Sequence, residues 1–155
     1  MTALRTRTPA GVEDTAHAAP GRPVLLATLE APILEEASRT AVDAAVESGQ
    51  PLLVVNAVET ALTRTMLTFG DTYIPPPAVE ESLTAPAELA HSLGVQVERI
   101  RLRSPRPVEA LIELATEREV GLLVLGADPA AMRKGRYRRS VRKVLDRLSC
   151  LVWVP

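Results

Sequence analysis

Residues 123–154 read LVLGADPAAMRKGRYRRSVRKVLDRLSCLVWV, and the order of features in this stretch predicts how the chain folds. The apolar run at residues 122–125 is typical of a strand that is buried on both faces of a sheet. It ends at Gly126, and a loop then leads to a helix predicted over about residues 140–148. A second apolar run, residues 151–154, closes the chain as a strand. A strand, a crossover helix and another strand in this order indicate a parallel pair.

The rest of the chain repeats this alternation. The elements predicted before residue 122 are, in order, the strand 24–28, the helix 33–48, the strand 52–58, the helix 79–93, the strand 95–102 and the helix 108–119. Pro86 lies inside its helix, so this helix is expected either to kink or to begin near Thr84. Strands alternating with helices predict an α/β domain, with a doubly wound sheet of five parallel strands and helices on both faces.

The chain divides into a tail and one domain. Residues 1–21 are rich in Thr, Ala, Pro and Gly without a hydrophobic period, so a mobile tail is predicted there. Residues 22–155 form the predicted domain. Within it, the long connection over residues 59–78 ends in three prolines, which exclude a helix interior there, and the segment 62–69 is a candidate for a short helix.

Composition excludes several function classes. Aromatic residues make up only 3% of the 155, so few side chains could stack on the bases of a single-stranded nucleic acid. The net charge is −1, but residues 126–155 carry 8 Lys and Arg against 2 Asp and Glu. This basic end predicts a local anion site or an interface, and it argues against general nucleic-acid binding.

The reactive residue types form no catalytic or metal-binding set. Cys150 is the only cysteine, and the two histidines, His17 and His91, are far apart in sequence. Zinc sites and Ser/His/Asp catalysis are therefore not expected, which favours a protein that is not an enzyme. No apolar run reaches the length of a membrane span, and no secretion signal is recognisable, so we expect a cytoplasmic location.

The C-terminal stretch resembles the signature of the universal stress protein family. In that family a buried strand ends in glycine and continues as an ATP-binding motif, G-x2-G-x9-G-[S/T]. Gly126 fills the first position, Pro129 the second, Arg139 the third and Ser140 the last, and Val141 continues the pattern. The resemblance implies ATP or another phosphate-containing ligand near Gly126, Arg139, Ser140 and Val141.

The resemblance also implies the strand order 3-2-1-4-5 and a homodimer paired through the last strand. The residues of that strand are Leu151, Val152, Trp153 and Val154. An apolar strand at the edge of a sheet is prone to pair with another chain, which independently favours association there.

Three departures from the family pattern leave two functions open. Pro129 lacks an N–H donor, Arg139 adds a side chain where the backbone should approach phosphate, and Leu29 replaces the acidic residue that ends the first strand, with Glu30 one step later. One reading is a non-enzymatic stress-response dimer that has lost typical ATP binding and acts through protein partners. The other is a nucleotide or phosphate-binding module. It would use the Arg-rich stretch 133–143 and the N–H groups of a helix that starts near Ser140.

Overall fold

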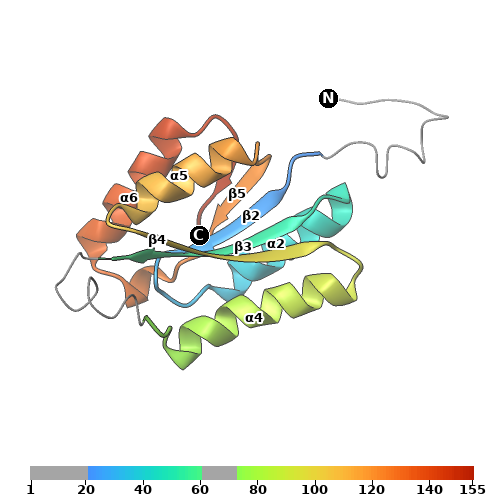
Figure 1. Cartoon of the computed structure of the whole chain (residues 1–155), viewed down its shortest axis with the longest axis horizontal. Helices are drawn as coiled ribbons and strands as arrows, with labels where there is room; N and C mark the ends of the chain where they lie inside the picture. The colour runs from blue at the N-terminus through green and yellow to red at the C-terminus, as the bar shows by residue number, and fades with distance from the viewer. Residues whose placement is uncertain (1–20, 61–72) are drawn as a thin grey trace, which may run out of the picture.

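The computed structural model describes residues 21–60 and 73–155 (Figure 1). Its elements, in chain order, are β2 (Val24–Thr28), α2 (Glu35–Ser48), β3 (Leu52–Glu59), α4 (Pro77–Ser92), β4 (Val97–Ser104), α5 (Pro107–Glu117), β5 (Leu122–Leu125), the 3-10 turn η1 (Pro129–Ala131), α6 (Lys134–Arg147) and β6 (Leu151–Trp153). The predicted tail, apart from Gly21, and the candidate helix at 62–69 lie outside the described residues.

The five strands form one sheet in the order β4-β3-β2-β5-β6, and every neighbouring pair is parallel. This is the order 3-2-1-4-5, so the predicted fold class and strand order are confirmed. The two middle pairings are in simple register, with Val24 opposite both Leu52 and Leu122. The carboxyl ends of β2 and β5 therefore meet at the same edge of the sheet.

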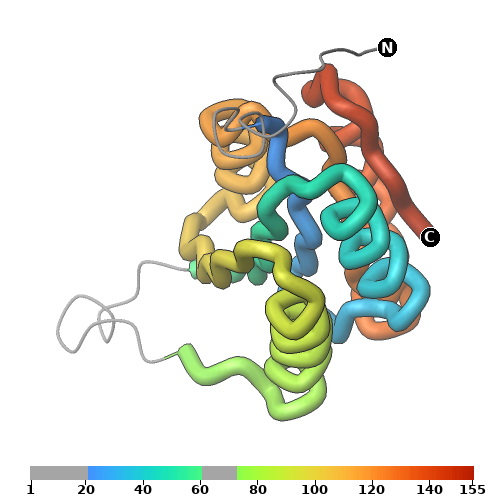
Figure 2. The backbone as a smooth tube through the Cα atoms, turned by 90° about the vertical axis from the view of Figure 1, so that its right-hand side faces the viewer, coloured from blue at the N-terminus to red at the C-terminus, as the bar shows by residue number. Residues whose placement is uncertain are grey.

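Helices cover both faces of the sheet (Figures 1 and 2). Leu26 and Val124 face the layer made by α2 and α4, whereas Leu25 and Leu123 face the layer made by α5 and α6. Because successive side chains of a strand point to opposite faces, the central strands must be apolar throughout. That is why their sequence runs are continuous.

All four described helices differ from their predicted bounds, and in two of them the difference has a clear physical reason. The first is α4, which begins at Pro77, the last of the three prolines, because proline is well suited to the first turn of a helix. Pro86 lies buried inside α4, and the helix continues through it. No helix in the described part of the chain is long and apolar enough to cross a membrane.

The second is α6, and here the prediction was wrong. It begins at Lys134, not near Ser140. Val141 and Val144 pack in the core, and Tyr137, which lies one helical turn before Val141, is partly buried, so the covered side of α6 starts before Ser140. The N-cap residue, Arg133, makes no capping hydrogen bond through its side chain. Ser140 is therefore an interior residue of the helix.

Candidate functional site

The candidate site lies at the switch-point edge, which we define as residues 29–34 after β2 and residues 126–133 after β5. The strand order reverses between these two strands, and ligands of open α/β sheets bind at such a point. Backbone hydrogen bonds join the two segments directly. Leu34 N donates to Gly126 O at 2.9 Å, and Asp128 N donates to Pro32 O at 2.8 Å.

Gly126 is buried at this edge and packs closely against α2. A Cβ atom at this position would lie 2.8 Å from Ile33 Cγ2 and 2.9 Å from Ala37 Cβ. Contacts below 3.0 Å are not tolerated between carbon atoms, so only glycine fits. Its own N–H donates to Ala27 O at 2.8 Å. The packing of α2 therefore accounts for the first glycine of the motif without a ligand.

Four backbone donors of the loop after β5, the N–H groups of Asp128, Ala130, Ala131 and Met132, are used within the protein. Asp128 caps the 3-10 turn, because its Oδ1 accepts from Ala130 N at 2.9 Å. Ala131 N donates to Asp128 O at 3.0 Å, and Met132 N donates to Pro129 O at 3.3 Å. Pro129 itself has no N–H. A phosphate-binding loop needs several N–H groups pointing into one space, and these four residues offer none.

The end of β2 is tied to the end of β3. Leu29 is 1% exposed and lies in the core beneath α5 and α6. Glu30 has a positive φ of 61°, and its N–H donates to Asn56 Oδ1 at 3.1 Å. The Glu30 carboxylate in turn accepts from Glu59 N at 2.9 Å. The acidic side chain of this edge therefore stabilises the protein's own backbone.

Arg136 connects α6 to both of these carboxylates. Its Nη2 atom lies 3.6 Å from Glu30 Oε2 and 3.6 Å from Glu59 Oε1. The Nη2 atom is buried and has no hydrogen-bond partner among the described residues, although about a third of the side chain is exposed. Partly exposed ion pairs of this length contribute only about 0–1 kcal/mol each to stability. The main effect of these two ion pairs is to hold the Arg136 guanidinium between the ends of β2 and β3.

The remaining predicted site residues do not meet Gly126. Ser140 is 5% exposed, and its hydroxyl donates to Arg136 O one helical turn earlier, at 2.8 Å. Val141 packs into the core on the α5 side. Arg139 and Ser140 line a hollow between α5 and α6, whereas the Cβ position of Gly126 faces α2 on the opposite side of the sheet. Ser140 lies inside α6, so its position does not supply the helix start on which the predicted anion site depends.

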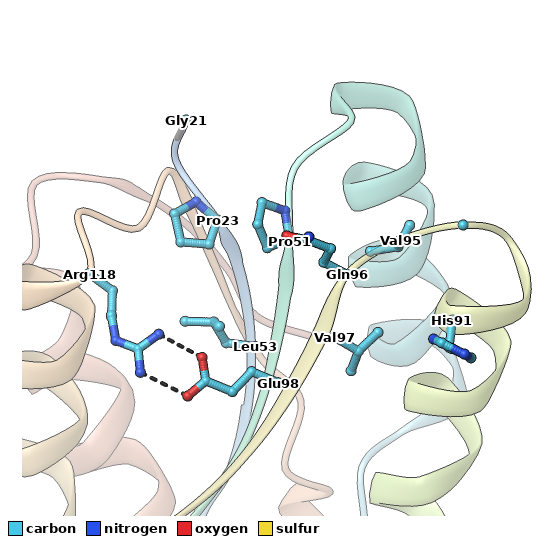
Figure 3. A pocket seen from close by; sticks show the side chains of 11 residues that line it. Gly21, Pro23, Pro51, Leu53, His91, Val95, Gln96, Val97, Glu98 and Arg118 are labelled. Atoms are coloured by element: carbon cyan, nitrogen blue, oxygen red, sulfur yellow. Dashed lines mark hydrogen bonds and ion pairs between the residues drawn. The ribbon is translucent and has the colours of Figure 1, made fainter. Parts of the chain in front are cut away.

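A larger hollow, of about 800 Å³, lies at the opposite end of the strands (Figure 3). Pro23 and Pro51, which precede β2 and β3, line it, together with His91 from α4. Arg118 donates two hydrogen bonds to the Glu98 carboxylate, at 2.8 and 2.9 Å, and these hydrogen bonds lower the pKa of Glu98. The amino ends of strands are not where ligands bind in this architecture, so we assign this hollow no function.

No group of three or more His, Cys, Asp or Glu side chains that could hold a metal ion occurs in residues 21–60 and 73–155. Cys150 is half-buried, and burial raises the pKa of its thiol, which keeps it protonated at neutral pH and unreactive. Sequence reasoning missed Glu59 and Asn56 and counted Arg136 only as a member of a basic cluster. Asn56 and Glu59 lie on β3 and Arg136 lies on α6, and only the fold brings them together at the end of β2.

Comparisons with known proteins agree on one family. A sequence profile of the universal stress protein family matches residues 21–154. The universal stress protein from Archaeoglobus fulgidus, solved in complex with dAMP, is 17% identical with a TM-score of 0.60. This alignment covers 88% of this chain and 98% of that one. A universal stress protein solved in complex with cAMP is 23% identical over the same shares, with a TM-score of 0.58. No match was found among curated proteins.

Proposed function

The chain belongs to the universal stress protein family, and on this premise we propose that it is a non-enzymatic stress-response domain that does not bind ATP in the manner of its family. It works instead as a dimer that engages protein partners. The fold of the family is retained, and the switch-point edge is used for the protein's own packing.

The observation that carries this proposal is the use of the loop amides. The N–H groups of Asp128, Ala130, Ala131 and Met132 all have acceptors within the protein. An unpaired backbone donor pointing at the ligand is what a phosphate-binding loop supplies. A triphosphate arriving here would have to break these hydrogen bonds first. The energy of breaking them would be subtracted from its binding energy.

The position of Arg136 supports the same conclusion. Its guanidinium lies between Glu30 and Glu59, where the ends of β2 and β3 face the start of α6. In an α/β sheet of this kind, this is the edge at which a ligand would sit. The phosphates of a nucleotide would therefore have to compete with the Glu30 and Glu59 carboxylates for this guanidinium.

The first test is a calorimetric titration of the purified chain with Mg-ATP. We expect a dissociation constant weaker than about 1 mM, which corresponds to less than about 4 kcal/mol of binding free energy. The physical reason is the loss of loop donors together with the absence of an acidic side chain at Leu29. Micromolar affinity would contradict the proposal.

A second candidate function is nucleotide binding with displacement of Arg136. It is favoured by the length of both Arg136 ion pairs, 3.6 Å, and by the two related structures, which hold dAMP and cAMP. Repeating the titration on Arg136→Met separates the two. If a nucleotide displaces Arg136, this variant changes the affinity, whereas the exposed Arg138→Met control does not. If ATP is excluded by the loop, all three proteins remain without measurable binding.

The proposed dimer pairs through β6. This strand is at the end of the sheet, is hydrogen-bonded on the side of β5, and exposes 74% of Leu151. Val152 packs toward the α5 and α6 layer, and Trp153 packs toward the α2 and α4 layer. Both side chains are therefore partly buried against the core of their own chain. Exposed apolar strand edges promote pairing between chains, and a second copy of the same edge is the simplest partner.

Leu151→Asp is expected to weaken the dimer by at least about tenfold without unfolding the monomer, because it places a charge on the exposed edge. Light scattering during size-exclusion chromatography measures the assembly, and a thermal melt checks the fold. Leu145→Asp is the matched control, because Leu145 is also half-exposed but lies on α6. If both variants remain dimeric, β6 is not the interface.

A further inference from the structure

A basic hollow of about 540 Å³ lies between the first turn of α5 and the length of α6, and we call it the α5–α6 groove. Figure 1 shows the two helices side by side on one face of the sheet. Its basic lining residues are Arg106, Arg136, Arg139, Arg142, Lys143 and Arg147. Three acidic residues, Glu59, Glu109 and Asp146, also line it, so the groove carries three positive charges in excess.

Most of this charge is not neutralised internally. Lys143 Nζ lies 2.8 Å from Glu109 Oε2, and Arg136 is shared between Glu30 and Glu59. Among the ion pairs of the described residues, none involves the other four arginines of the groove, Arg106, Arg139, Arg142 and Arg147. Arg106 is close enough to Glu109 to help lower the pKa of that carboxyl, but none of the four guanidinium groups makes an ion pair with a described residue, so they repel one another unless an anion is present.

The protein already places one anion in the groove. Glu109 is in the first turn of α5, and its carboxylate accepts a hydrogen bond from Lys143 across the groove. That hydrogen bond is the main reason why the pKa of Glu109 is lowered, and a hydrogen bond from its own backbone N–H adds to it. A carboxylate is therefore held in its charged form at the wall of the groove.

The size and the lining of the groove limit the class of ligand. A volume of about 540 Å³ falls in the range of small-molecule sites. Pro105, Pro107 and Val108 form an apolar wall beside the cationic side chains. Arginine binds phosphate through two parallel hydrogen bonds and presents donors from a planar fork. A phosphorylated organic molecule suits a groove with this combination of walls.

We propose that the α5–α6 groove binds a phosphorylated small molecule with at least two negative charges. Arg106 from the turn before α5 and Arg139 from α6 hold the phosphate from opposite walls, and the apolar wall contacts the organic part. This site does not include the loop after β5. It shares Glu59 and Arg136 with the switch-point edge, but the two arginines that hold the phosphate, Arg106 and Arg139, lie outside that edge.

The test uses inorganic pyrophosphate as the probe, with calorimetry for affinity and amide chemical shifts for location. The groove variant is the double substitution Arg106→Gln and Arg139→Gln. The control is Arg133→Gln with Arg138→Gln, which removes the same charge from exposed residues that do not line the groove. We expect the groove variant to lose at least about tenfold in affinity and the control less than about twofold. Chemical shifts should change at the first turn of α5 and along α6.

Four outcomes overturn the proposal. The first is no binding of pyrophosphate to the unchanged protein at millimolar concentration. The second is an equal loss of affinity in the two double variants, which would mean that the basic surface acts as a whole. The third is a set of shifts confined to residues 126–133, which would place the ligand at the switch-point edge. The fourth is tighter binding of a short RNA with a steep salt dependence and equal losses in both variants. Since all four arginines are exposed, thermal melts of both variants should match the parent.

Discussion

Leu29→Asp is expected to unfold the protein at neutral pH, although it restores the acidic residue of the family pattern. Leu29 is 1% exposed and packs among the apolar residues beneath α5 and α6. A carboxylate there loses its hydration and gains no cationic partner. The expected cost is above about 4 kcal/mol, a large part of the stability of a domain of this size. Urea denaturation followed by circular dichroism measures it.

Leu29→Asn is the matched control, because it has the same shape without the charge. Burial holds the folded-state pKa of the introduced carboxyl above its unfolded value of about 3.9, so the charge penalty is absent below that value and grows as the pH rises. The two variants should therefore have similar free energies of unfolding near pH 4 and differ widely at pH 7. Equal stability at pH 7 would mean that position 29 is open to solvent, as a ligand-binding acid requires.

The sheet was predictable because its central strands are buried on both faces. The runs at residues 24–28 and 122–125 contain only apolar residues and Thr28, and no other element of a small α/β domain has that pattern. β4 was also recognisable, because it is an edge strand whose polar and apolar residues alternate. Packing on each face dictates residue type, and residue type is what a sequence displays.

The start of α6 was not predictable for a related reason. Helix starts are recognised by Ser, Thr, Asp or Asn at the N-cap, and Arg133 occupies that position here. Ser140 has the character of a cap residue, so it suggested a start that is in fact the second turn of the helix. Its hydroxyl donates to Arg136 O, which is how serine satisfies itself inside a helix.

The use of the switch-point edge depends on contacts between distant segments. Glu30, Glu59 and Arg136 are brought together only by the strand order and by the early start of α6. Sequence reasoning placed Arg136 in a basic cluster and treated the cluster as one possible anion site. The structure distinguishes its members, because Arg136 is paired with the Glu30 and Glu59 carboxylates, whereas Arg139 and Arg142, which line the α5–α6 groove with it, make no ion pair with a described residue. The backbone hydrogen bonds of η1 could not be predicted either, because Asp128 is the only residue there with a side chain typical of a cap.

Gly126→Val is expected to destabilise the protein by about 3 kcal/mol or more, because the site has no room for a side chain. The added Cβ would meet Ile33 Cγ2 at 2.8 Å and Ala37 Cβ at 2.9 Å. Relaxation is restricted, since Gly126 O accepts from Leu34 N and Gly126 N donates to Ala27 O. The φ of Gly126 is not positive, so steric overlap and not backbone strain is the cause. Denaturation in urea gives the free energy of unfolding.

Gly135→Val is the matched control, because a Cβ at Gly135 has nothing within 4 Å and valine is about as tolerable as glycine in a helix. We expect its stability to change by less than about 1 kcal/mol. Adding Ala37→Gly to Gly126→Val should recover part of the loss, because it removes one of the two overlapping atoms. If Gly126→Val costs no more than the control, the segment after β5 can move away from α2. In that case the glycine would not be needed for packing, and a role in approaching phosphate would again be the better explanation for it.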